Sequence, residues 1–116
     1  MTGDIENGAV YPSLKDRSVF ITGGGSGIGE ALVEHFCAQG SRVAFIDLAE
    51  EASQHLVARI AAKGDPAPHF MPGDLRDIER LRAAIGEAAD RHGPIKVLCN
   101  NAGNDDRHKS EDVTVD

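Results

Sequence analysis

Three features that would assign this chain to other classes of protein are missing from its 116 residues. No apolar run approaches the roughly 20 residues that cross a bilayer. The first residues are polar and acidic, unlike a signal peptide. No stripe of basic residues offsets the formal net charge of −7, which argues against general affinity for nucleic acid. We therefore expect a cytoplasmic protein whose partners include neither a membrane nor a nucleic acid.

Cysteine is scarce, and the pattern of metal-ligating residues is weak. Cys37 lies in a predicted helix and Cys99 in a predicted strand, without C-x-x-C or zinc-like spacing, so we expect two buried free thiols. Asp105, Asp106 and His108 could in principle hold a metal ion. Clustered polar residues in a loop are more often solvated, however, and no second ligand pair is spaced to help them. No metal site is predicted.

Apolar runs and helical periods alternate along the chain. Strands are predicted over residues 18–22, 42–46, 69–71 and 95–99, and helices over about 27–39, 49–63 and 77–92. Strands that alternate with helices imply a parallel sheet with right-handed crossovers. The expected fold is therefore an α/β doubly wound (Rossmann-type) parallel sheet, truncated after the fourth strand. Residues 1–16 lack any period and are expected to form an N-terminal arm.

The helical periods also predict which residues face the sheet. The expected stripe of the first helix is Ile28, Ala31, Leu32, His35 and Phe36. That of the second helix is Ala52, Leu56, Val57 and Ile60. In the third helix the residues at this spacing are Ile78, Leu81, Ile85 and Ala88.

A glycine-dense turn directly follows the first apolar run, and residues 22–29 read Thr-Gly-Gly-Gly-Ser-Gly-Ile-Gly. A strand that breaks into such a turn and then opens a helix presents free backbone N–H groups to a phosphate. Gly23 would form the tight turn, Gly27 would admit a pyrophosphate close to the backbone, and Gly29 would allow close helix–strand packing. The loop predicts a dinucleotide site. A flexible glycine linker is the alternative, disfavoured by the flanking strand and helix.

Polar residues follow the other predicted strands. Asp47 could accept hydrogen bonds from an adenosine ribose and repel a 2′-phosphate, and it could also serve as a helix N-cap. Asp74 alone could be simple turn chemistry. The segment Asn100-Asn101-Ala102-Gly103 combines amide side chains, which can satisfy backbone groups at a strand end, with small residues that let the chain pass close to a ligand.

Two of these motifs, T-G-x-x-x-G-I-G and N-N-A-G, occur in this order and resemble signatures of the short-chain dehydrogenase/reductase family, over about residues 17–103. A methyl-donor-dependent methyltransferase also uses a glycine loop and an acidic residue, but it is disfavoured because both motifs occur together. The resemblance implies hydride transfer between a nicotinamide ring and an alcohol or carbonyl carbon. It implies cofactor contacts from Gly23, Gly25, Ser26, Gly27, Ile28, Gly29, Asp47, Leu48, Asp74, Leu75, Asn101, Ala102 and Gly103.

The resemblance also favours NAD over NADP. Members that prefer NADP commonly carry a basic residue beside the glycine loop or after the second strand. Ser26 and Leu48 stand at those positions here. The cofactor is therefore predicted to be NAD.

The catalytic residues of the family do not fall within the part of the chain that resembles it. Members use a tyrosine, a lysine four residues later, a serine and an asparagine, all beyond the fourth strand. Tyr11 and Lys15 do form Y-x-x-x-K, but Tyr11 precedes the first strand and Pro12 follows it, so no helix places both side chains over a nicotinamide. We interpret this pair as coincidence and expect no catalytic residue in this chain.

Residues 17–116 are thus expected to be the NAD(P)-binding half of a longer single-domain enzyme, inactive alone. Its substrate would be a small alcohol or carbonyl compound. The alternative is a non-catalytic dinucleotide-binding module or subunit. The residues up to Asp116 leave homo-oligomerisation open, since the helices through which the family usually assembles lie beyond them.

Overall fold

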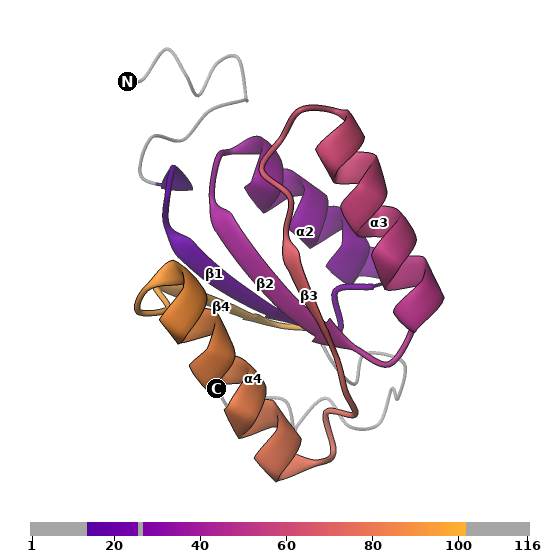
Figure 1. The fold of residues 1–116 in the computed structure, drawn as a ribbon, viewed down its shortest axis with the longest axis vertical. Coiled ribbons are helices and arrows are strands. Elements are labelled where there is room, and N and C mark those ends of the chain that lie inside the picture. Colours follow the sequence, from indigo (N-terminus) through magenta and orange to yellow (C-terminus); the bar gives the residue numbers. More distant parts are fainter. Residues whose placement is uncertain (1–13, 26, 102–116) are drawn as a thin grey trace.

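The computed structural model describes residues 14–25 and 27–101. Strands and helices alternate throughout these residues (Figure 1). In chain order the elements are β1 (Ser18–Thr22), α2 (Gly27–Ala38), β2 (Arg42–Asp47), α3 (Glu50–Ala62), β3 (His69–Pro72), α4 (Ile78–His92) and β4 (Val97–Asn100). The alternation predicted from the sequence is confirmed, with ends that differ by one or two residues.

The described strands form one parallel sheet in the order β3-β2-β1-β4. Val19 of β1 lies beside Val43 of β2 on one side and Val97 of β4 on the other. The chain therefore builds outwards from β1 through β2 to β3 and then returns to place β4 on the opposite side of β1. This order, with helices on both faces, confirms the doubly wound Rossmann-type fold.

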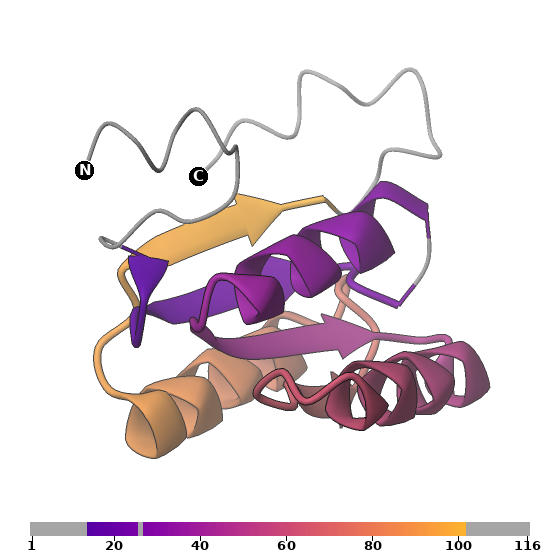
Figure 2. The same cartoon turned by 90° about the horizontal axis from the view of Figure 1, so that it is seen from above.

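Helices cover both faces of the sheet (Figure 2), and each face packs against them through its own apolar cluster. One cluster joins alternate residues of β1 and β2, such as Ile21 and Phe45, to α2 and α3. The other joins Phe20 and Ile46 to Met71 and to α4. All five residues of β1 are buried, because a central parallel strand has helices on both sides.

The predicted stripe of α2 is correct in part, since Leu32 and Phe36 pack, partly buried, against the cluster on this face of the sheet. The helix buries residues one position beyond the expected stripe: Gly29, Val33 and Cys37. Three residues of the expected stripe are exposed: Ile28, Ala31 and His35. The cause is Gly29, at which the helix touches the carbonyl of Gly23 in the preceding loop, so the residues at helical spacing after Gly29 face the sheet.

Smaller corrections apply to the other helices and to β4. In the first turns of α3, Ser53 is buried and its neighbour Ala52 is exposed, contrary to the prediction. Leu56 and Ile60 are buried as predicted. Ile78 at the start of α4 is 55% exposed. The last strand begins at Val97, two residues later than expected.

No helix in the described part of the chain is both long and apolar enough to cross a membrane. The described residues also contain no group of three or more side chains that could hold a metal ion. The metal-ligating candidates Asp105, Asp106 and His108, and the rejected Tyr11, lie outside the described residues.

The two thiols differ in their surroundings. Cys37 is buried in the cluster beneath α2, and its burial raises its pKa from 9.0 to about 12. Cys99, in β4, is only partly buried, which corrects the expectation of two buried thiols. Its pKa is also raised by burial.

Cys37 is expected to resist alkylation while the protein is folded. Lifting the thiol pKa to about 12 lowers its thiolate fraction at pH 8 by roughly a hundredfold to a thousandfold relative to an ordinary cysteine. Pulsed iodoacetamide labelling with mass spectrometry of the Cys37 peptide would measure this. The same peptide labelled in urea serves as the control, and equal labelling rates in both states would contradict the burial of this thiol.

Candidate functional site

The candidate site lies along the edge at which the parallel strands end. The segments that leave β1, β2, β3 and β4 there contain the motifs singled out from the sequence (Figure 1). Strand order reverses at β1, because the chain continues to β2 on one side and returns to β4 on the other. Open α/β sheets bind their ligands outside the carboxyl ends of the strands at such a switch point.

The loop after β1 owes its shape to glycines with positive φ. Gly23 has φ 68° and Gly27 has φ 58°, a backbone conformation that L side chains rarely adopt. The Gly23 N–H donates to the carbonyl oxygen of Ile46 at 2.8 Å, which ties the start of the loop to β2. Apart from its chain neighbours and the backbone of its own helix, no described residue has an atom within 4 Å of the position that a Cβ of Gly27 would occupy, so this side of the α2 start is open among the described residues.

Two further glycines of the loop are packed without room for a side chain. A Cβ at Gly29 would overlap the carbonyl oxygen of Gly23 and lie 2.7 Å from Nδ2 of Asn101. A Cβ at Gly25 would overlap the hydroxyl of Ser53 and lie 3.0 Å from the carboxyl carbon of Asp47. The loop is therefore held between β4 on one side and the end of β2 with α3 on the other.

The Asp47 carboxylate is fixed by two backbone N–H groups. Its Oδ2 accepts a hydrogen bond from the N–H of Gly25 at 2.9 Å, and its Oδ1 accepts one from the N–H of Ala49 at 2.7 Å. The N-cap interpretation is wrong, since the N-cap of α3 is Ala49, which makes no side-chain cap bond. Asp47 is partly buried, and each oxygen keeps a second lone-pair direction for another donor.

Two large apolar side chains at this edge are exposed. Ile28, in the first turn of α2, is 64% exposed, and Leu48, directly after Asp47, is 63% exposed. Each would lose contact with water if a ligand lay along the edge between them. Sequence reasoning singled out both as candidate contacts.

Thr22 and Asn101 join the carboxyl ends of β1 and β4. The Thr22 hydroxyl donates to Oδ1 of Asn100 at 2.9 Å and accepts from the backbone N–H of Asn101 at 2.9 Å. Nδ2 of Asn101 donates to the carbonyl oxygen of Gly23 at 3.0 Å. Sequence reasoning gave Thr22 no role, although a polar residue that ends a buried apolar strand was a usable signal.

Replacing Thr22 by valine is expected to lower the free energy of unfolding by about 1–2 kcal/mol, because this buried hydroxyl joins two strand ends and valine has the same shape. Thr22→Ser, which keeps the hydroxyl, is the matched control and should lose less. Urea unfolding followed by circular dichroism measures both. A Thr22→Val variant as stable as the parent would show that the hydroxyl contributes nothing.

Asp74 faces a partner that the sequence analysis missed. Its Oδ1 accepts from the backbone N–H of Arg76 at 2.9 Å, and its Oδ2 lies 2.9 Å from the Arg76 guanidinium. These hydrogen bonds lower the pKa of the Asp74 carboxyl. Arg76 is exposed and Asp74 is partly exposed, and neither side chain forms a hydrogen bond with Asp47. Leu75 packs beneath it against the cluster of α4.

The loop that carries Asp74 and Leu75 begins beside the end of β2, since the Gly73 N–H donates to the carbonyl oxygen of Asp47 at 3.2 Å. Ser26, Ala102 and Gly103 lie outside the described residues.

Comparison with known proteins gives this arrangement a family. The pattern of the family described as short chain dehydrogenase matches residues 17–116. Over 90% of its length the chain is 54% identical to a probable galactose dehydrogenase of Rhizobium meliloti, and over 91% it is 49% identical to a D-xylose 1-dehydrogenase of Caulobacter vibrioides. It spans 41% of the length of each of these relatives.

Solved structures of the family share the fold. A putative short-chain dehydrogenase from Novosphingobium aromaticivorans superposes with a TM-score of 0.69 at 31% identity, over 74% of this chain and 31% of that one. A hydroxysteroid dehydrogenase from Escherichia coli superposes with a TM-score of 0.72 at 30% identity, over 78% of this chain and 38% of that one. The chain therefore belongs to the short-chain dehydrogenase family.

Proposed function

We propose that this chain binds NAD along the carboxyl edge of its sheet. It would be the cofactor-binding half of a longer NAD-dependent oxidoreductase that moves a hydride between nicotinamide and an alcohol or carbonyl carbon. The observation that carries the proposal is the Asp47 carboxylate, held by the N–H groups of Gly25 and Ala49 beside the glycine loop. The membership of the family supports the oxidoreductase class.

The pyrophosphate would be held by the loop and the first turn of α2. The first N–H groups of a helix have no intrahelical partner, and the positive end of the helix favours an anion. The open space beside Gly27 supports this role, because a side chain there would stand between the phosphate and those N–H groups. Gly23, Gly25, Gly29 and Ser26 would shape the same cradle, and Ile28 would cover it from the side.

The adenosine would lie between the ends of β2 and β3. The remaining lone pairs of the Asp47 carboxylate would accept hydrogen bonds from the two ribose hydroxyls. Its negative charge would repel the 2′-phosphate of NADP. Leu48 and Leu75 would line the apolar faces of the adenine. The Asp74 carboxylate would accept a hydrogen bond from its exocyclic amine. A carboxylate has about four acceptor directions, so the Arg76 pair leaves room for that bond.

The inner side of the cofactor would lie against Asn101, Ala102 and Gly103. The nicotinamide ring, when bound, supplies the carbon that accepts or gives up the hydride. The residues that hold the substrate and move its proton would come from the part of the longer enzyme beyond these strands, as the resemblance implies. The chain alone is accordingly expected to bind the cofactor without turnover.

The names of two relatives support a sugar as the substrate. One is a probable galactose dehydrogenase at 54% identity, and the other is a D-xylose 1-dehydrogenase at 49% identity. We propose that the longer enzyme oxidises an aldose at its first carbon. Cofactor binding and sugar oxidation are separable, because the first uses residues of this chain and the second needs the rest of the enzyme.

Calorimetric titration of the purified chain with NAD and with NADP tests the proposal. The expected result is saturable binding of NAD that is at least about tenfold tighter than binding of NADP, which corresponds to about 1.4 kcal/mol of discrimination. Equal or tighter binding of NADP would overturn the role of Asp47. No binding of either dinucleotide would overturn the site itself. Assays of the longer enzyme with galactose, xylose and a non-sugar alcohol then test the substrate class.

A further inference from the structure

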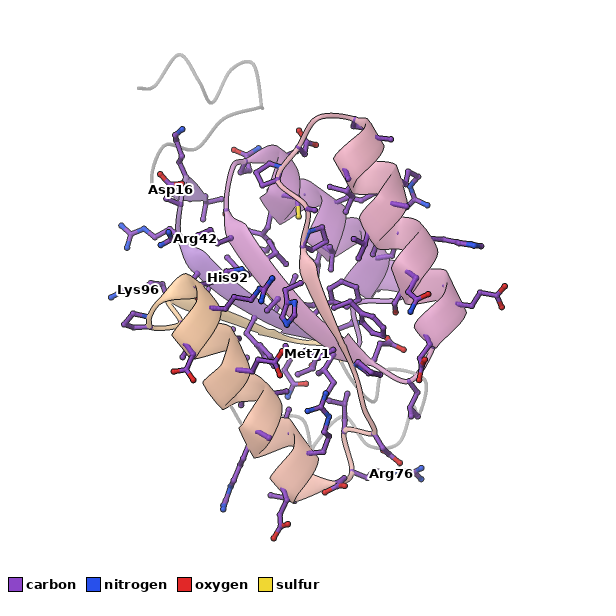
Figure 3. The ribbon with its side chains drawn as sticks, in the orientation of Figure 1. Asp16, Arg42, Met71, Arg76, His92 and Lys96 are labelled. Carbon is purple, nitrogen blue, oxygen red and sulfur yellow. The ribbon has the colours of Figure 1, made fainter. Side chains whose placement is uncertain are left out.

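The opposite edge of the sheet holds a second candidate site. A hollow of about 390 Å³ opens where the strands begin, lined by cationic side chains from separate segments of the chain. They are Lys15 and Arg17 before β1, Arg42 at the start of β2 and Lys96 before β4, with His92 at the end of α4. Figure 3 shows the labelled side chains of Asp16, Arg42, His92 and Lys96 in this one region. We call it the basic hollow.

The backbone fixes the places from which these cations project. The N–H of Arg42 donates to the carbonyl oxygen of Arg17, and the N–H of Lys96 donates to that of Ser18, both at 2.8 Å. The Arg42 guanidinium reaches to within 4.0 Å of the Cβ position of Gly93, at the end of α4. The hollow is thus built on the sheet and is not a chance grouping of loop side chains.

Three of the cations lack an acidic partner. Among the described residues none forms an ion pair with Lys15, Arg42 or Lys96. Elsewhere in the described part of the chain Arg59, Lys63 and Arg76 are paired with carboxylates, whereas Arg80, Arg82 and Arg91 of α4 form no ion pair. This concentration of positive charge opposes the net charge of −7 of the whole chain. Like charges held close together cost free energy unless an anion offsets them.

Helix ends offset only part of this charge. The C-termini of α2 and α4 reach this edge, and each contributes about half a negative charge. If the negative charge of Asp16 is counted against Arg17, the other three cations carry three positive charges. The two helix ends together carry about one negative charge, so about two positive charges are left without an offset. Complementing helix dipoles therefore does not account for all of them.

Two polar atoms on residues that line the hollow also lack a partner. Oγ of Ser18 and Nδ1 of His92 are buried and form no hydrogen bond with the described residues. Burial lowers the pKa of the His92 imidazole, and the electrostatic effects of His69, Arg91 and Arg42 lower it further. A bound oxyanion would accept a hydrogen bond from Nδ1 when that nitrogen carries the proton, and it would offset the charges of the cations that line the hollow.

We propose that the basic hollow binds a small anion that carries two or more negative charges, either an organic phosphate or a polycarboxylate. Its volume lies within the range of about 300–1,000 Å³ typical of small-molecule sites. This site is separate from the proposed dinucleotide site, because it lies at the amino ends of the strands. It therefore does not depend on the proposed function.

The test is a titration of the ¹⁵N-labelled 116-residue chain, followed by NMR at constant ionic strength. Inorganic pyrophosphate and citrate are the two probes, which separate phosphate from carboxylate chemistry, and chloride is the monovalent control. Three charge-assisted contacts correspond to saturation at about 1 mM or below. We expect saturable shifts of the Arg42, Gly93 and Lys96 amides with one or both probes and none with chloride.

Variants decide whether the hollow is the site. The double variant R42Q/K96Q is expected to bind at least about tenfold more weakly. The matched control K63Q/R82Q removes the same charge from other surfaces and should bind nearly as the parent does. K15Q/K96Q, which leaves β2 untouched, replaces the first variant if that one does not fold. Shifts confined to the glycine loop, or equal losses in the test and control variants, would overturn the proposal.

Discussion

Replacing Gly29 by alanine is expected to lower the free energy of unfolding by about 2–4 kcal/mol and to abolish measurable binding of dinucleotide. The added methyl group would overlap the carbonyl oxygen of Gly23, and it would lie 2.7 Å from Nδ2 of Asn101. Neither neighbour can rotate away cheaply. The Gly23 carbonyl belongs to the backbone, and the Asn101 side chain is held to that carbonyl by a hydrogen bond of 3.0 Å.

The overlap can be relieved only by moving α2 away from the loop or by reshaping the loop. Either movement would displace the N–H groups at the start of α2 that we propose to hold the pyrophosphate. Binding is therefore expected to suffer more than stability, since a displacement of about 1 Å suffices to spoil a positioned site. Urea unfolding and NAD calorimetry on the same preparation measure the two effects.

Gly86→Ala is the matched control for Gly29→Ala. Gly86 lies on the exposed side of α4, and a Cβ there would meet nothing within 4 Å. Alanine is the better helix former, so this variant should gain roughly 0.5–1 kcal/mol of stability and bind NAD as the parent does. If Gly29→Ala bound NAD normally, close approach of α2 to the loop would not be needed for the site.

Glycine spacing let the sequence predict much of this geometry, for a physical reason. A close approach between backbones can be made only where a side chain is missing, so the requirement appears directly in the residue type. The same glycine explains why the face of α2 that packs on the sheet was predicted only in part. Ile28, Ala31 and His35 fit a helical period as well as Val33 and Cys37 do, and only the contact at Gly29 decides between them.

Pairings between side chains were less predictable than the backbone. Arg76 stands two residues after Asp74. Side chains two residues apart do not face each other on a helix, so this spacing gives no sign of a pair. A turn brings the two side chains together. The basic hollow collects residues from four segments, and no local pattern links Lys15 to Arg42 or Lys96. Such groupings follow from sheet order, which has to be known first.

Removing the Asp47 carboxylate is expected to change cofactor preference. In Asp47→Ala the advantage of NAD over NADP should fall by about 10–100-fold, because a ribose hydroxyl loses a charged acceptor and the 2′-phosphate loses a repelling charge. The free energy of unfolding should fall by about 1–3 kcal/mol, since the N–H groups of Gly25 and Ala49 lose their partner.

These two effects can be separated by comparing the cofactors. Disorder of the loop after the loss of the Gly25 bond would weaken NAD and NADP equally, because both carry the same pyrophosphate. A change in their ratio reports only what happens at the ribose. Calorimetry with both dinucleotides, on the parent and on Asp47→Ala, gives both numbers.

Glu50→Ala is the control for the change of charge. Glu50 is exposed in the first turn of α3, and no hydrogen bond or ion pair joins its side chain to the glycine loop among the described residues, so this variant removes the same unit of charge nearby. Screening at physiological salt limits the reach of an exposed charge to about 8 Å. The ratio of NAD to NADP affinity should then stay within about twofold of the parent. An equal change in both variants would mean that general charge, and not the carboxylate held by Gly25 and Ala49, sets the preference.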